Sequence, residues 1–374
     1  MLIKLGLGAK GVDAVAEMIL VNIDKFVTCW SAYALPLYPL NFVAMVRVRP
    51  EMGKYNVIIM VVLLMDAIIA RGQWTFGGGG DGLSMNYYIM SCPFAEGIVK
   101  DIVNRHLQFD PSLAAALVRM HFHDCFIQGC DASILIESTK GNKAEKDSPA
   151  NLSLRGYEII DEAKEEVERQ CPGVVSCADI IAMAARDASG GPVYDIPKGR
   201  KDGRRSRIED TRNLPSPTLN TSELIKMFDQ HGFSAQEMVV LSGAHTLGVA
   251  RCSSFKHRLS NFDTTHEVDP SMEAQFAQTL SRTCSAGDTA EQPFDSSRNS
   301  FDNDYFYALM RKNGVLFSDQ TLYSSPRTRG FVNGYAMNQA MFFFDFQQAM
   351  VKMGTLDVKD GSNGEVRGNC RVIN

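Results

Sequence analysis

Residues 118–136 read VRMHFHDCFIQGCDASILI, and this stretch poses the central question of the sequence. Histidines, an arginine, aspartates and cysteines lie together in a run that is otherwise apolar. Apolar neighbours predict burial, and a buried charge costs free energy unless a partner or an ion compensates it. The stretch therefore indicates a buried polar site.

Arg119 and His123 are four residues apart, so on a helix they lie on one face, one turn from each other. A cation and a titratable imidazole on one face suit a pocket that holds an anionic or polarisable ligand. His121 must point elsewhere, because it is only two residues from His123. A satisfied core histidine is the alternative interpretation for each.

A short loop follows that is rich in possible oxygen ligands. Asp124, Asp131 and Ser133 lie close together in the sequence. Calcium prefers oxygen ligands gathered on a short loop, and the carbonyls of a turn can add to them. Cys125 and Cys130 bracket the turn, so a disulfide between them would fix its shape. No EF-hand pattern is present, and calcium is therefore a hypothesis from spacing alone.

A separate histidine, His245, lies late in the apolar stretch LSGAHTLGVARC (residues 241–252). Histidine is a common metal ligand, and its other ring nitrogen usually needs an acceptor. Asp319, in LFSDQTLY (residues 316–323), is a candidate acceptor. Spacing alone cannot bring His123, His245 and Asp319 together, and a core histidine is again the alternative.

The chain has 374 residues, of which 45% are apolar and 22% charged, as in ordinary globular proteins. A net charge of −5 argues against a general nucleic-acid-binding protein. Of the nine cysteines, eight lie between Cys92 and Cys370, whereas Cys29 stands apart. This even set predicts four disulfides in an oxidising compartment. The alternative is a cytosolic protein with buried thiols, and spacing does not assign the pairs.

Residues 52–72 have the layout of a secretory signal peptide. Lys54 gives a positive start, Val57–Ala70 an apolar core broken once by Asp66, and small residues end the segment at Gly72. The segment is too short and too interrupted for a membrane span. A buried helix of the domain is the alternative.

The remaining N-terminal residues fall outside the expected domain. We interpret residues 1–51 as an upstream extension that the mature protein lacks, with a membrane anchor as the alternative. Residues 73–86, with GGGGDG at 77–82, predict a flexible linker and not a phosphate loop, because the required lysine is missing. The folded domain is then residues 87–374.

Helical patterns dominate that domain, and long strand patterns are absent. Asp110 is the expected N-cap of a helix that carries Arg119 and His123. Thr221 or Ser222 is the expected cap of another helix, and Ser234 starts a capping box. We expect a mostly α-helical domain with long, structured loops.

Eight motifs together resemble the secretory plant (class III) heme peroxidases, in the family's order and over about residues 87–374. They are YYIMSCPFAEGIV, VRMHFHDCFIQGCDAS, AEKDSPANLSLRGYEIID, CPGVVSCADIIAMAARD, NLPSP, LSGAHTLGVARC, FDNDYF and LFSDQTLY. The resemblance implies a two-lobed, mostly α fold with little β structure and heme b between the lobes.

On the distal side of that heme, the resemblance gives His123 the role of general acid–base catalyst. Arg119 would stabilise the charge that develops as peroxide is cleaved, and Asn151 would orient His123. Phe122 would wall the pocket, and Pro215 would mark the edge where aromatic donors approach.

On the proximal side, the resemblance makes His245 the iron ligand and Asp319 the acceptor of its other ring nitrogen. Phe294 is expected to pack beside the His245 ring.

The resemblance also implies two calcium ions and a disulfide pairing. The distal calcium would take Asp124, Ile127, Gly129, Asp131 and Ser133, with Glu145 linking it to the distal network. The proximal calcium would take Thr246, Asp295, Ser297, Ser300 and Asp302, in a loop one residue shorter than usual. The pairing would be Cys92–Cys171, Cys125–Cys130, Cys177–Cys370 and Cys252–Cys284.

The expected function is oxidation of small phenols, such as lignin and suberin precursors and wall phenolics, with hydrogen peroxide. We expect a secreted monomer, in the cell wall or the vacuole, without a nucleic-acid or stable membrane partner, and with a glycosylation candidate at Asn220. One alternative is a heme- and calcium-containing binding protein of the same fold with little turnover. Another, a zinc hydrolase built on His121, His123 and Asp124, lacks a second histidine at a helical four-residue step.

Overall fold

The computed structural model describes residues 82–374. The proposed extension (1–51), the signal peptide (52–72), most of the linker (73–86) and Cys29 lie outside the described residues. Ser84, within the linker range, exchanges two backbone hydrogen bonds with Lys198 at 2.8 and 2.9 Å. The described end of that range is therefore joined to the domain.

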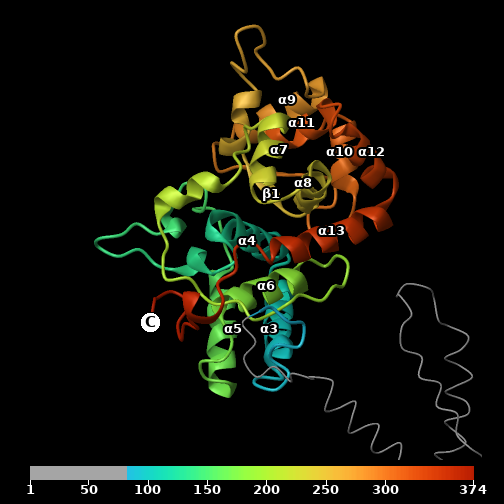
Figure 1. Ribbon diagram of the computed structural model, residues 1–374. Helices are drawn as coiled ribbons and strands as arrows, with labels where there is room; N and C mark the ends of the chain where they lie inside the picture. The colour runs from blue at the N-terminus through green and yellow to red at the C-terminus, as the bar shows by residue number, and fades with distance from the viewer. Residues whose placement is uncertain (1–81) are drawn as a thin grey trace, which may run out of the picture. The chain divides into compact units, whose positions relative to one another are not determined.

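The described chain is mostly helical, as predicted, and its helices pack in two groups (Figure 1). The first lobe contains α3 (Ala95–Phe109), α4 (Leu113–Gln128), α5 (Tyr157–Gln170) and α6 (Cys177–Ala188). The second contains α7 (Thr221–Gln230), α8 (Ala235–Ser242), α9 (Ala274–Cys284), α10 (Asp304–Met310), α11 (Phe317–Ser324), α12 (Arg329–Met337) and α13 (Gln339–Met353).

The helices contact one another within each lobe: α6 packs on α3, α4 and α5, and α8 packs on α7, α12 and α13. Between residues 82 and 374 the strand content is small, as expected. It consists of β1 (Val249–Arg251) and β2 (Glu291–Pro293), which pair antiparallel.

Helix α4 is the central element of the first lobe. Most of its residues are buried, including polar His121, His123 and Asp124. It starts two residues later than the sequence pattern suggests, because Asp110 accepts hydrogen bonds from Ser112 and forms a turn before the helix. It also runs on to Gln128, so Asp124 lies on the helix and not on the loop that follows.

Capping side chains define the start of two helices in the second lobe. Asn220, and not Thr221 or Ser222, caps α7, because its side chain accepts from two backbone N–H groups while Glu223 completes a capping box. Ser234 and Glu237 form the predicted capping box of α8.

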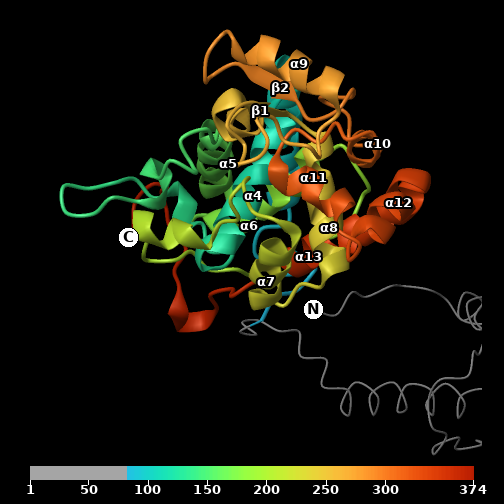
Figure 2. The ribbon, with the colours of Figure 1, turned by 90° about the horizontal axis from the view of Figure 1, so that it is seen from above.

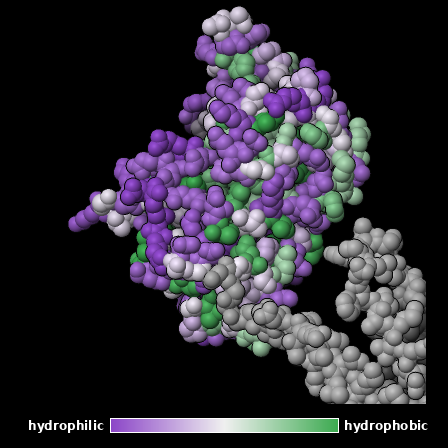
Figure 3. All heavy atoms as spheres, viewed as in Figure 1, coloured by the Kyte–Doolittle hydropathy of each residue, from purple (hydrophilic) through white to green (hydrophobic). Residues whose placement is uncertain are grey.

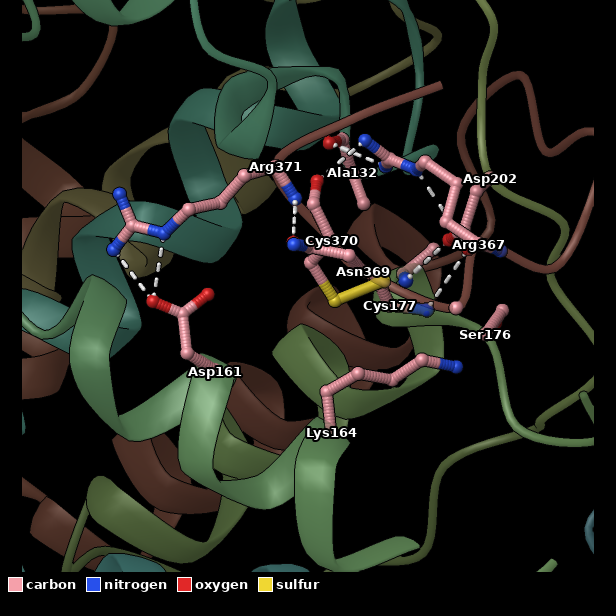
Figure 4. Close-up of a disulfide and its surroundings, with 12 residues drawn as sticks. Ala132, Asp161, Lys164, Ser176, Cys177, Asp202, Arg367, Asn369, Cys370 and Arg371 are labelled. Carbon is pink, nitrogen blue, oxygen red and sulfur yellow. Dashed lines mark hydrogen bonds and ion pairs between the residues drawn. A yellow bond between two sulfur atoms is a disulfide. The ribbon is translucent and has the colours of Figure 1, made fainter. Parts of the chain in front are cut away.

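The eight cysteines within residues 82–374 form four disulfides, with the pairing that the resemblance implies: Cys92–Cys171, Cys125–Cys130, Cys177–Cys370 and Cys252–Cys284. The Cys177–Cys370 bond joins the start of α6 to the C-terminal segment, which thereby returns to the first lobe (Figure 4).

The face seen in Figure 3 is mainly hydrophilic, with hydrophobic residues scattered among polar ones. Among residues 82–374, no helix combines the length and the hydropathy that crossing a membrane requires.

Candidate active site

Arg119 and His123 lie one turn apart on α4, as their spacing predicts. Arg119 Nε donates a hydrogen bond to His123 Nε2 at 3.2 Å. The other guanidinium nitrogens donate to Ser153 Oγ at 2.8 Å and to the Ala150 carbonyl at 2.9 Å. The guanidinium is therefore oriented on three sides, with one nitrogen toward the imidazole.

A second chain of hydrogen bonds fixes His123 from behind. His123 Nδ1 lies 2.6 Å from Asn151 Oδ1. Asn151 Nδ2 donates to the Glu145 carbonyl at 2.8 Å, so its amide oxygen must face His123. Because an amide oxygen only accepts, Nδ1 carries the proton, and Nε2 is the unprotonated acceptor that faces Arg119 Nε.

Burial determines the charge states of this pair. Loss of hydration, together with the nearby Arg119, lowers the pKa of His123 to about 3, so the imidazole is neutral at physiological pH. Loss of hydration lowers the pKa of Arg119 to about 10, and the cation of Arg251 on β1 contributes. Arg119 therefore remains charged beside a neutral base. Burial and Arg200 likewise lower the pKa of His121 to about 3.

His245 lies in the short 3₁₀ helix η4 (Gly243–Thr246), directly after α8. Its Nδ1 is 2.8 Å from Asp319 Oδ1, and its ring stacks on Phe294 with centroids 4.4 Å apart and planes 3° from parallel. Asp319 is almost fully buried. The structure thus brings together the three residues expected on the proximal side.

The two histidine sites come from elements that touch. Helix α4 contacts η4, and a Cβ at Gly248 would lie 2.7 Å from that of Ala115 on α4. Figures 1 and 2 both show β1, which follows η4, beside α4. The influence of Arg251 on Arg119 is consistent with this placement.

The donor set at His245 fits a heme iron. About 38% of its side chain is exposed, and Nε2 has no hydrogen bond to any residue from 82 to 374. An imidazole that is fixed at one nitrogen and open at the other is suited to bind a metal.

The residues expected at a distal calcium site surround a buried, acidic space. Asp124 Oδ2 accepts from the Ala132 N–H at 3.0 Å, and Ser133 Oγ donates to Glu145 Oε2 at 3.0 Å. The other oxygens of Asp124 and Glu145 are buried and have no hydrogen-bond partner in the described part of the chain. Ile127 and Gly129 lie at the end of α4, where the Ile127 carbonyl accepts from Asn213.

Burial raises the pKa of Asp124 well above its usual range and that of Glu145 to about 9, and the neighbouring carboxyls add to both shifts. The pKa of Asp131 is raised by burial as well. Buried carboxyls that repel one another, with orphaned oxygens, fit a bound cation. Among the described residues, no three His, Cys, Asp or Glu side chains alone form a metal site, and a cation at this loop would also need carbonyl and hydroxyl oxygens as ligands.

The residues expected at the proximal calcium lie next to His245. Thr246 Oγ1 is 2.7 Å from Asp295 Oδ2 and 3.0 Å from Asp302 Oδ1. Ser297 Oγ is 3.1 Å from Asp295 Oδ1 and 3.0 Å from Asp302 Oδ1. Ser300 joins the same turn, because its N–H donates to the Ser297 carbonyl at 2.6 Å.

Phe122 and Pro215, the residues expected near the donor, differ in how directly they contact the catalytic residues. Phe122 packs edge-on against the His123 ring, with centroids 5.7 Å apart, and against Phe126. Pro215 is half-buried after the 3₁₀ helix η3 (Ile208–Asn213). Asn213, at the end of η3, donates to the Ile127 carbonyl at 2.9 Å, which ties this segment to α4.

Sequence analysis missed two residues of the site. Tyr305 is buried, and its hydroxyl donates to Asp319 Oδ1 at 2.9 Å, so this oxygen accepts from both Tyr305 and His245. Ser153 orients Arg119. Tyr305 lies within the motif FDNDYF and Ser153 two residues after Asn151, but neither type of residue by itself indicates such a role.

A separate surface depression is lined mainly by charged side chains, those of Lys143, Arg205, Arg207, Glu209, Asp210 and Arg212. Neither histidine of the candidate site contributes to it.

Comparison with known proteins agrees with this arrangement. The sequence profile of the family described as Peroxidase matches residues 99–338. The chain is similar to Peroxidase 47 of Arabidopsis thaliana, with 69% identity over 327 residues, 87% of this chain and 97% of the relative. It is also 48% identical to Peroxidase 66 of Arabidopsis thaliana over 299 residues (78% and 92% of the two chains) and to Peroxidase 5 of Vitis vinifera over 301 residues (78% and 92%).

Proposed function

Because the chain belongs to the class III plant peroxidases, which use hydrogen peroxide as oxidant, we propose that it oxidises small phenolic donors outside the cell. Membership makes the chain an enzyme, so the alternative of a binding protein with little turnover is set aside. The class uses heme b and calcium. We infer that this chain binds one heme b and two calcium ions.

His245 would hold the heme through Nε2, with Phe294 against the imidazole ring. A bound heme would take up two oxidising equivalents from peroxide and pass them to donors one at a time. The hydrogen bond from His245 Nδ1–H to Asp319 Oδ1, at 2.8 Å, increases the basicity of Nε2.

The distal residues His123 and Arg119 transfer the peroxide proton and stabilise the developing negative charge. Neutral His123 takes the peroxide proton at Nε2 and returns it to the departing oxygen, which leaves as water. This requires an imidazole that is unprotonated at working pH, as its low pKa provides. Arg119 stabilises the negative charge that develops as the O–O bond breaks.

Asn151 keeps the proton of His123 on Nδ1, so that Nε2 is the nitrogen that would take the peroxide proton. Glu145 connects these hydrogen-bonded residues to the loop after α4. Its backbone carbonyl accepts from Asn151, and its carboxyl accepts from Ser133. A calcium ion there would compensate the buried carboxyls and rigidify the support of His123.

The observation that carries the proposal is the row of hydrogen bonds from Arg119 to His123 and from His123 to Asn151, which orients the imidazole. The test compares the holoenzyme with His123→Leu and with the control His106→Leu, whose imidazole bonds to Glu162 away from this site. Stopped-flow absorbance at the heme band measures peroxide cleavage. We expect a loss of roughly 100-fold or more for His123→Leu and none for the control. Unchanged cleavage in His123→Leu would refute the assignment.

Donor class and location need separate tests. Guaiacol should be oxidised with saturation, and substitution of Phe122 by Ala should change its KM; oxidation of inorganic iodide but not of guaiacol would reject phenolic donors. Secretion predicts that protein from plant tissue begins at or near Gln73, after the signal peptide. A mature chain that retains residues 1–51 would contradict this.

A further inference from the structure

The loop after α4 turns at Ala132, which has a left-handed backbone conformation with φ 57° and ψ 22°. A residue with a Cβ atom is strained there, and glycine is the usual choice. Ala132 is fully buried and separates Asp131 from Ser133, two of the inferred calcium ligands. Its conformation therefore decides how these two residues face the ion.

Two hydrogen bonds hold Ala132 in this conformation. Its N–H donates to Asp124 Oδ2 at 3.0 Å. Its carbonyl accepts from Arg367 Nη2 at 2.7 Å, and the same nitrogen is 3.4 Å from the Asp131 carbonyl (Figure 4). Arg367 lies more than two hundred residues later in the chain, in the C-terminal segment.

Arg367 is itself held rigidly. Its side chain is fully buried, and Nη1 donates to the Cys370 carbonyl at 2.7 Å. Its backbone N–H donates to Asp202 Oδ2 at 2.9 Å, while Asp202 also accepts from the N–H groups of Cys177 and Ala178 at the start of α6. The Cys177–Cys370 disulfide closes this arrangement.

The charge of Arg367 by itself would repel a cation nearby. Asp202 lies 3.8 Å away, however, and offsets part of that charge. The remaining charge of Arg367 opposes the rise in the pKa of Asp124 and of Asp131 that burial causes. Beyond this charge, Arg367 contributes geometry to the loop, because its directed donors hold the Ala132 carbonyl.

We propose that Arg367 is a positioning residue that fixes the left-handed turn at Ala132 and thereby shapes the distal calcium site. The inference rests on the proposed function, because it presumes that calcium binds between Asp124, Asp131 and Ser133. It assigns to the C-terminal segment a role in metal binding and, through Glu145 and Asn151, in orienting His123.

The test uses Arg367→Lys, which keeps the charge but loses the planar fork, and Arg371→Lys as the matched control. Arg371 lies on the other side of Cys370 and pairs at the surface with Glu137 and Asp161. Purified holoenzyme is mixed with a chelating dye, and the rate and number of calcium ions released are measured. We expect one of the two ions to leave about 10-fold faster in Arg367→Lys than in the wild type. In Arg371→Lys, both ions should leave at the wild-type rate.

A rescue variant separates positioning from general stability. Ala132→Gly removes the strain of the turn, so Arg367→Lys/Ala132→Gly should release the ion more slowly than Arg367→Lys. The proposal would be overturned if Arg367→Lys released both ions faster or neither ion faster. It would also be overturned if Arg371→Lys had an equal effect, or if Ala132→Gly failed to slow the release. If Arg367→Lys does not fold, the double variant must fold; failure of both overturns the proposal too.

The outcome for the unmodified enzyme distinguishes this inference from the proposed function. If the wild-type holoenzyme holds no calcium at this loop, both the calcium assignment and the role of Arg367 fail. If it holds two ions and Arg367→Lys releases them as the wild type does, only the role of Arg367 fails.

Discussion

Replacing Asn151 by alanine tests the orientation of the catalytic base most directly. The substitution removes the acceptor 2.6 Å from His123 Nδ1 and leaves the Arg119 contact in place. A hydrogen bond to a neutral imidazole contributes about 0.5–1.5 kcal/mol, and one to the imidazolium formed during peroxide cleavage about 1.5–3 kcal/mol. The transition state should lose about 1–2 kcal/mol more than the ground state, so cleavage should slow roughly 5- to 30-fold.

The pH profile supplies a second readout for the same variant. Only neutral His123 accepts a proton, so cleavage in the wild type should fall as the pH drops toward the pKa of about 3. Because the bond to Asn151 raises that pKa, Asn151→Ala should move the acid limb to lower pH.

The assay is stopped-flow absorbance at the heme band after mixing with peroxide. The control Asn142→Ala removes an amide that likewise donates to a carbonyl, that of Ser206, at 2.8 Å, but lacks contact with His123. A rate for Asn151→Ala within twofold of the wild type, or an equal loss in Asn142→Ala, would refute the reasoning.

Three further outcomes are expected. Asp319→Asn weakens the hydrogen bond to His245, so the midpoint potential of the iron should rise; spectroelectrochemical titration that finds it unchanged would count against the assignment. Chelation of calcium should lower the unfolding temperature. Lowering the pH from about 9 toward 6 should partly restore it, because Glu145 has a folded-state pKa of about 9 and its protonation in this range favours the folded state. Gly129→Ala should destabilise the fold by about 2 kcal/mol or more, because the backbone has φ +95° and a Cβ would lie 2.5 Å from a carbonyl oxygen. Gly141→Ala is the control, because a Cβ there would lie in open space. Equal thermal unfolding of the two variants would contradict this prediction.

Local patterns predicted much of the helical structure and missed some of its boundaries. Ser234 and Glu237 form a capping box within four residues, so the sequence alone contains all partners. Asn220, Thr221 and Ser222 are all residue types that can cap a helix, and only the backbone geometry selects Asn220 for α7. Asp110 instead stabilises a turn before α4, which local spacing did not distinguish from a cap.

The site divides in a similar way. Arg119 and His123 were recognisable as a pair because helical periodicity places residues four apart on one face. His245 and Asp319 are 74 residues apart, and only their motifs related them before the structure placed Nδ1 and Oδ1 at 2.8 Å.

The sequence by itself determined the helical class, the pairing of Arg119 with His123, and, through its ordered motifs, the family and the residues to examine. The tertiary structure alone decided that Tyr305 shares the Asp319 oxygen and that Ser153 and the Ala150 carbonyl orient Arg119. It alone decided that Arg367 supports the turn at Ala132, 235 residues away in the chain. Periodicity and capping act between residues a few positions apart, whereas these contacts depend on how distant segments pack.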